Sequence, residues 1–192
     1  MEQKLLNGVD VHALADTIKA VKADTGLAAF RFGLENTWKG GGANVSLIDA
    51  YSGAGEDFTR EQPFEVRNDE PPVLLSGDTG PNPVENLLHA LAGCLATSLV
   101  YHAAAMGMKV DAVNTRFEGD LDLRGFLGLD DSVRNGYGQI RAVFEIDGDL
   151  DEAQKEYLVQ VAQERSPVFD VVSNGTEIEC SLENSGMKAI AV

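Results

Sequence analysis

Apolar residues near the start of the chain recur at intervals of three and four, which is the spacing of an amphipathic helix. The stripe occupies residues 9–23 and consists of Val11, Leu14, Ile18 and Val21. Asp10 stands where a residue capping the first turn is expected, and Gly26 follows the end. We expect a helical appendage over residues 1–26, ahead of a main domain that begins at residue 27.

The pattern of apolar positions then changes toward the alternation typical of strands. Strand signals within residues 27–66 lie at residues 27–32, 45–48 and 63–66. The triplet Gly40-Gly41-Gly42 separates the first two. No Lys-Ser or Lys-Thr pair follows this triplet, so we interpret it as a hairpin turn and not as a phosphate-binding loop.

The most strongly marked element is a long apolar helix over residues 83–107, which follows a Pro- and Gly-rich loop at residues 67–82. Asn82 is a suitable cap, Pro83 suits the first helical position, and Glu85 suits the positive end of the helix dipole. No other charged residue follows within the helix. A helix that is apolar nearly all round is expected to be buried on most sides.

The C-terminal half combines a hairpin with one helix and one further strand. Residues 109–124 and 137–147 are expected to be paired strands, since residues 115–122 and 139–146 alternate within them. Residues 151–165 have a helical period. Residues 176–182, TEIECSL, alternate as a final strand. Because strands and helices are grouped and do not alternate strictly, the fold class is α+β, with a single domain over residues 27–192.

The charge and the apolar runs exclude several classes of protein. The 192 residues carry a net charge of −16, which disfavours binding to nucleic acid or to an anionic membrane surface. The long helix is interrupted by polar residues, and no run of about 18 apolar residues occurs that would indicate a membrane span. We expect a cytoplasmic protein, in which cysteines stay reduced.

Candidate chemistry centres on Cys94, in the long helix, while Cys180 falls on the apolar face of the last strand. A free cysteine is either a small core residue or a nucleophile, and a nucleophile needs a nearby cation or donor. The two cysteines and the three dispersed histidines do not have the spacing of a metal site. We expect neither a metal ion nor a cofactor.

The run from Gly80 to Cys94, GPNPVENLLHALAGC, resembles the OsmC/Ohr family of osmotically induced and organic hydroperoxide resistance proteins. The runs GDLDLRGFLGL and Ser166-Pro-Val-Phe-Asp resemble the same family, and the likeness covers residues 36–184. It implies an intertwined homodimer of α+β fold with sites at the subunit interface. It also implies a thiol peroxidase in which the cysteine of the central helix attacks the peroxide.

The sequence departs from the family pattern at the residues that assist the cysteine. Ser166 stands where active members have a second cysteine, and the turn at residues 40–44 lacks the family's arginine. Aligned with the family, Val84 stands at the position of the orienting glutamate and Glu85 follows it, so the resemblance leaves Glu85 as the orienting carboxylate. It leaves Arg31, or Lys39, as the nearby cation. Because Ser166 cannot form a disulfide, turnover would need an external thiol.

Two hypotheses about function follow. In the first, Cys94, with Glu85 and Arg31, reduces organic hydroperoxides in a one-cysteine cycle with an external thiol reductant. In the second, the protein keeps the dimer cleft but binds a small hydrophobic ligand without catalysis. Reaction of Cys94 with a stoichiometric amount of hydroperoxide separates the two hypotheses.

Overall fold

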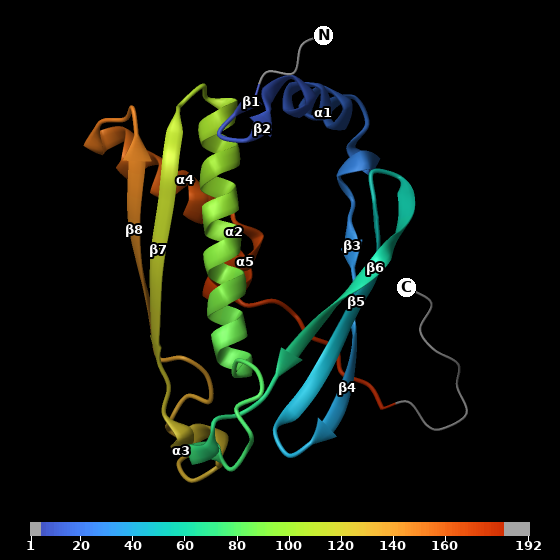
Figure 1. Ribbon diagram of the computed structural model, residues 1–192, viewed down its shortest axis with the longest axis vertical. Coiled ribbons are helices and arrows are strands. Elements are labelled where there is room, and N and C mark those ends of the chain that lie inside the picture. Colours follow the sequence, from blue (N-terminus) through green and yellow to red (C-terminus); the bar gives the residue numbers. More distant parts are fainter. Residues whose placement is uncertain (1–4, 183–192) are drawn as a thin grey trace. The chain divides into compact units, whose positions relative to one another are not determined.

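The computed structural model describes residues 5–182 of the chain, which fall into two compact units (Figure 1). One unit, here called the helical unit, contains residues 5–12 and 87–175. The other, here called the sheet unit, contains residues 13–86 and 176–182.

The sheet unit is built around one long strand, β5. Its elements are α1 (Val11–Ala23), a short 3₁₀ turn η1 (Thr25–Ala28), β3 (Arg31–Phe32), β4 (Glu35–Gly40), β5 (Ala43–Gly53), β6 (Glu56–Asn68) and η2 (Pro72–Leu74). Strands β3, β4 and β6 all pair antiparallel with β5. The glycine triplet forms the β4–β5 turn as predicted, with positive φ angles at Gly40 and Gly41 that glycine adopts without strain.

The helical unit contains one long helix, three shorter helices and two hairpins, of which the longer hairpin lies beside the long helix (Figure 1). Its elements are β1 (Leu5–Leu6), β2 (Val9–Asp10), α2 (Pro83–Ala105), β7 (Val110–Asp120), α3 (Leu123–Phe126), β8 (Gln139–Gly148), α4 (Glu152–Arg165) and α5 (Pro167–Asn174). Strands β7 and β8 form the predicted antiparallel pair. The buried core joins α2, the hairpin and α4 through Leu91, Leu95, Leu99, Ala103, Val110, Ile146, Leu158 and Ala162.

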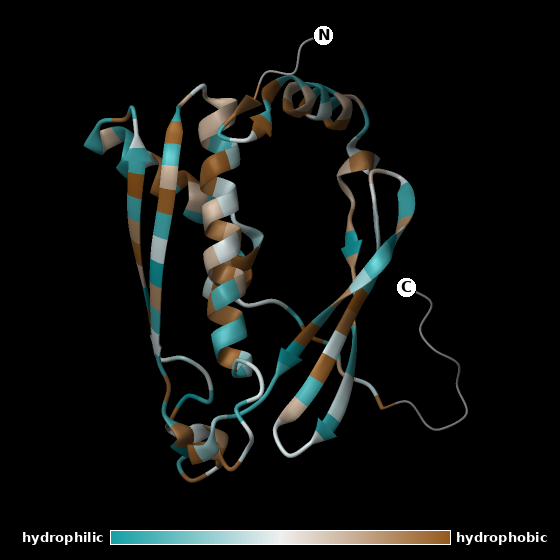
Figure 2. Ribbon diagram, in the orientation of Figure 1, coloured by the Kyte–Doolittle hydropathy of each residue, from teal (hydrophilic) through white to brown (hydrophobic). Residues whose placement is uncertain are grey.

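Burial of α2 is confined to one face, which corrects the expectation of a helix buried on most sides. Its fully buried leucines are four residues apart, at Leu91, Leu95 and Leu99, and so form one narrow stripe. Figure 2 shows apolar residues along the whole helix, with the most polar turns near its start. Apolar surface outside the stripe, such as Leu87 and Tyr101, stays exposed within the chain.

The predicted final strand is wrong for the described part of the chain. Residues 176–182 have no helix or strand, and Cys180 is exposed. An alternating segment forms a strand only when a neighbouring strand takes up its hydrogen bonds, and no described strand pairs with these residues. Residues 183 and 184, where the family resemblance ends, lie outside the described residues.

The N-terminal appendage contains a hairpin that precedes the expected helix. Strands β1 and β2 are joined by Asn7-Gly8, both with positive φ, as the turn of a tight hairpin requires. The Asn7 amide donates to the Met108 carbonyl oxygen at 2.9 Å, and Asn7 Oδ1 accepts from the Val110 amide at 2.9 Å. These two hydrogen bonds attach the hairpin to the start of β7.

Candidate active site around Cys94

The start of α2 is fixed by a reciprocal cap in which Glu85 takes part. Asn82 Oδ1 accepts from the Val84 amide at 2.8 Å, and the Glu85 carboxylate accepts from the Asn82 amide at 2.8 Å. Such a capping box satisfies amides that the first turn would otherwise leave unpaired. The carboxylate of Glu85 is therefore engaged with the backbone of its own helix terminus.

Cys94 lies in the middle of α2 and is half-buried. Nine residues separate it from Glu85, which corresponds to about 13 Å along the helix and about half a turn around it. Gly93 and Thr97, its neighbours on the unburied side, are both exposed. The thiol of Cys94 is accordingly not fully buried in the core. The geometry of α2 does not bring the Glu85 carboxylate close to this thiol.

Arg31, the cation suggested by the resemblance, is the first residue of β3 and is exposed. It belongs to the sheet unit, whereas Cys94 belongs to the helical unit. The structure therefore does not define the distance between the guanidinium group of Arg31 and the sulfur of Cys94.

Ser166, which stands at the family's second cysteine, joins two helices. It is only 1% exposed. Its amide donates to the Ala162 carbonyl oxygen at 2.9 Å, at the end of α4, and its hydroxyl accepts from the Phe169 amide at 3.1 Å, at the start of α5. Ser166 followed by proline is a helix-start signal from which α5 could have been predicted, although α5 was not among the helices expected from the sequence.

An amide network, which the sequence did not indicate, holds the first turn of α2 against the sheet. Asn86 donates to Asn68, and Asn68 donates to Asn44 Oδ1 at 3.0 Å. Asn36 donates to the same oxygen at 2.9 Å and to the Ser46 hydroxyl at 2.8 Å. The five side chains come from three strands and a helix, so no spacing along the chain reveals them.

The loop before α2 is organised by Asp69, a carboxylate only 2% exposed. It accepts hydrogen bonds from the hydroxyl of Ser76, from the hydroxyl and amide of Thr79 at 2.8 and 2.9 Å, and from the Glu70 amide at 2.8 Å. These bonds, that of Ser76 foremost, hold the pKa of Asp69 well below its usual value.

Replacing Asp69 by asparagine is expected to lower the Tm by several degrees at pH 7, because the variant cannot accept all four hydrogen bonds. Because the pKa of Asp69 is lower in the folded chain than in the unfolded chain, where it is about 4, the ionised carboxylate stabilises the fold at pH values above about 4. This stabilisation is lost as the pH falls below that value. Thermal unfolding at pH 7 and pH 3 should thus show a large difference between wild type and variant at pH 7 and a smaller one at pH 3. Asp78→Asn, at an exposed position of the same loop, is the control and should leave the Tm unchanged; equal losses in both variants would contradict this role.

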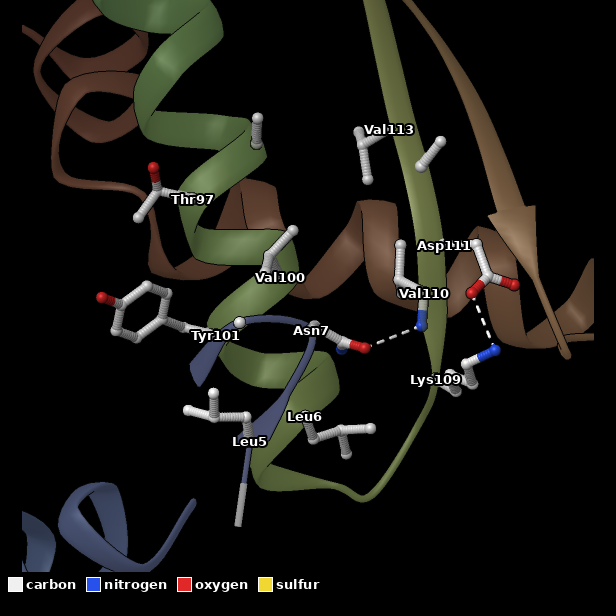
Figure 3. Close-up of a pocket in the computed structure, with 13 residues that line it drawn as sticks. Leu5, Leu6, Asn7, Thr97, Val100, Tyr101, Lys109, Val110, Asp111 and Val113 are labelled. Carbon is white, nitrogen blue, oxygen red and sulfur yellow. Dashed lines mark hydrogen bonds and ion pairs between the residues drawn. The ribbon is translucent and has the colours of Figure 1, made fainter. Parts of the chain in front are cut away.

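Two hollows of the helical unit are lined in part by residues of α2 near Cys94. The first, of about 700 Å³, is a groove between α2 and β7 beneath the N-terminal hairpin (Figure 3). It includes Thr97 and Tyr101, which are three and seven residues beyond Cys94 and share its side of the helix. The second, of about 640 Å³, uses Leu87, Leu91 and Leu95. Neither hollow includes Cys94 itself within the part of the chain described.

Metal binding and membrane insertion are two further properties that the described residues bear on. Among residues 5–182, no group of three or more His, Cys, Asp or Glu side chains is placed to hold a metal ion. By length and composition α2 could cross a membrane, a property that it shares with the core helices of soluble proteins.

Comparison with known proteins identifies the family. The profile of the OsmC-like protein family matches residues 76–181, so the chain belongs to this family. The matched range begins in the Asp69 loop and contains α2 with Cys94, the β7–β8 hairpin, α4 and α5. No curated protein matches the sequence significantly.

Solved structures show the same fold at low identity. An OsmC-like protein from Mycoplasma pneumoniae is 14% identical over 74% of this chain and 87% of its own, with a TM-score of 0.58. An OsmC-like protein of unknown function from Vibrio cholerae is 14% identical over 73% and 92%, with a TM-score of 0.53. A hypothetical protein from Aquifex aeolicus is 16% identical over 76% and 89%, with a TM-score of 0.53.

Proposed function

We propose that the protein is a thiol peroxidase that reduces organic hydroperoxides through Cys94. The observation that carries the proposal is the position of Cys94, half-buried on the unburied side of α2, within the segment matched by the OsmC-like family. A sulfur in this position is reachable by a small oxidant, whereas a structural cysteine would lie in the core stripe.

In the proposed reaction the Cys94 thiolate attacks the terminal oxygen of the hydroperoxide. An S–O bond forms, the O–O bond breaks, and the leaving alkoxide takes a proton to become an alcohol. Cys94 becomes a sulfenic acid. An external thiol then attacks this sulfur and releases water, and a second thiol reduces the mixed disulfide. Ser166 cannot resolve the sulfenic acid, so both reducing equivalents come from outside the chain, as a reducing cytosol would supply.

We further propose that the protein works as a homodimer and that the second copy completes the site. The unburied side of α2 offers Ala90, Gly93, Cys94 and Thr97, small residues over which another backbone can pack closely. Glu85 is engaged in its cap and Arg31 lies in the other unit. The helix around Cys94 offers no lysine or arginine that would stabilise the thiolate. We propose that Arg31 of the second copy supplies this cation.

Replacing Cys94 by serine is expected to reduce hydroperoxide turnover by about 100-fold or more, because a serine hydroxyl is a far weaker nucleophile at neutral pH. The assay follows consumption of cumene hydroperoxide with dithiothreitol as reductant. Cys180→Ser, which removes the chain's other thiol, is the matched control and should retain wild-type turnover. Equal rates for wild type and Cys94→Ser would end the peroxidase proposal.

A second function is favoured by the second of the two hollows. Its walls are largely apolar and include Leu91, Leu95, Phe117, Phe144 and Phe169. A protein that only binds a small hydrophobic ligand would use this hollow and leave Cys94 unoxidised. Retention of an apolar fluorescent probe, lost when Phe117 is replaced by a charged residue, would support binding, and unchanged retention would count against it.

A further inference from the structure

The second hollow, at the first half of α2, combines apolar walls with one charged side chain. Its walls come from α2, the β7–β8 hairpin and α5 and include Leu91, Leu95, Phe117, Phe144 and Phe169. Arg134, in the connection between α3 and β8, is the one charged side chain among the described residues that line the hollow. In a chain with 31 acidic and 15 basic residues, a lining that holds a cation and no carboxylate favours an anionic ligand.

Two glycines hold the connection that carries Arg134 against the rest of the helical unit. Gly125 is buried in α3, and a Cβ atom added there would lie 2.7 Å from the Arg134 carbonyl oxygen. A Cβ atom added at Gly119 of β7 would lie 2.5 Å from the ring of Tyr137. Side chains at these two glycines would displace residues 134–137, so the position of Arg134 is set by close packing against the glycine backbone.

The guanidinium group of Arg134 forms no ion pair with a carboxylate of the described part of the chain. Three other arginines of the same unit, Arg116, Arg124 and Arg141, do form ion pairs with aspartate or glutamate. Arg134 Nε lies 3.9 Å from the place of a Cβ atom at Gly136, which also lines the hollow. The N–H donors of Arg134 are therefore available to a ligand in the hollow.

We propose that this hollow binds a small amphipathic anion, whose aromatic body lies against the leucine and phenylalanine side chains while its anionic group pairs with Arg134. A volume of about 640 Å³ is within the range of small-molecule sites. Phe117 and Phe144 meet edge to face, with ring centroids 6.2 Å apart, and a ligand ring can extend this contact. Hydrogen bonds between a guanidinium group and an anion are about twice as strong as those between neutral groups.

The inference rests on the ligand-binding function proposed for this hollow and adds the charge of the ligand. It does not depend on the peroxidase chemistry, because Cys94 does not line the hollow.

Two fluorescent probes that differ by one charged group test the inference on the full chain. The probes are anilinonaphthalene sulfonate and its uncharged parent, phenylnaphthylamine, and fluorescence titration measures the Kd of each. Arg134→Gln removes the cation of the hollow. Arg165→Gln is the matched control, because Arg165 is exposed at the end of α4 and does not line the hollow. Ala142→Trp fills the hollow, since Ala142 lines it directly opposite Phe117. Thermal unfolding checks that each variant is folded.

We expect the wild type to bind the sulfonate at least about tenfold more tightly than the parent, a difference of about 1.4 kcal/mol. Arg134→Gln should abolish this preference, Arg165→Gln should keep it, and Ala142→Trp should weaken the binding of both probes. Equal affinities in the wild type, or a preference that survives Arg134→Gln, would overturn the inference and leave the binding of uncharged apolar ligands standing. Binding of neither probe, or binding that Ala142→Trp leaves unchanged, would overturn both.

Discussion

Replacing Gly93 by leucine is expected to convert the proposed dimer to a monomer without unfolding the protein. A Cβ atom added at Gly93 would meet no atom within 4 Å other than those of its own stretch of helix, and leucine is the better helix former by about 0.8 kcal/mol. If the second copy packs on this side of α2, the added side chain costs about 1–3 kcal/mol at each of two symmetric positions. The dimer dissociation constant should then rise by roughly 100-fold or more.

Sedimentation over a range of concentrations measures this constant, and thermal unfolding of the monomer checks the fold. Gln160→Leu adds leucine to an exposed position of α4 and should leave the dissociation constant unchanged. A Gly93→Leu variant as dimeric as wild type would show that the unburied side of α2 is not the interface. A variant that is both monomeric and unfolded would instead show that Gly93 packs within its own chain.

Replacing Leu99 by alanine is expected to destabilise the protein by about 2–5 kcal/mol, the range for large-to-small changes in a packed core. Leu99 has no exposed surface and stands at the centre of the α2 stripe. Urea unfolding should show a lower midpoint with an unchanged slope. Leu129→Ala deletes the same atoms from a side chain that is 70% exposed and should cost less than about 1 kcal/mol. Similar costs at both positions would contradict the core described for the helical unit.

Helices α2 and α4 and the β7–β8 hairpin could be predicted because the residues that indicate them lie close together in the sequence. Asn82 and Glu85 mark the start of α2, and Asp151 and Gln154 form a capping box at the start of α4. Alternation marks β7 and β8, which follow each other in the chain and pair directly. In each case, residues close in sequence carry the information.

Burial and long-range pairing could not be predicted in the same way. The apolar residues on all sides of α2 indicated that the helix is buried on most sides. Composition does not say whether the residues that bury it belong to the same chain. Alternation at residues 176–182 indicated a strand, yet alternation does not say whether a neighbouring strand is present to pair with the segment, and no described strand does so. The tight turn at Asn7-Gly8, by contrast, carried a usable hairpin signal that was missed because the helical stripe beside it dominated the interpretation.

The candidate site was predicted in part. The sequence singled out Cys94, and the structure leaves it half-buried. The network of Asn36, Asn44, Asn68 and Asn86 was not predictable, because hydrogen bonds among four distant amides leave no pattern in the sequence. The roles of Glu85 and Arg31 toward the thiol remain proposals that depend on the second copy.

Reaction of Cys94 with an organic hydroperoxide can be followed by intact-protein mass spectrometry. The native protein, freed of reductant, receives one equivalent of cumene hydroperoxide and is sampled within seconds with a reagent that traps sulfenic acids. We expect rapid addition of one oxygen atom, trapped at Cys94 and not at Cys180. Recovery of the unmodified mass with both thiols still titratable would contradict it.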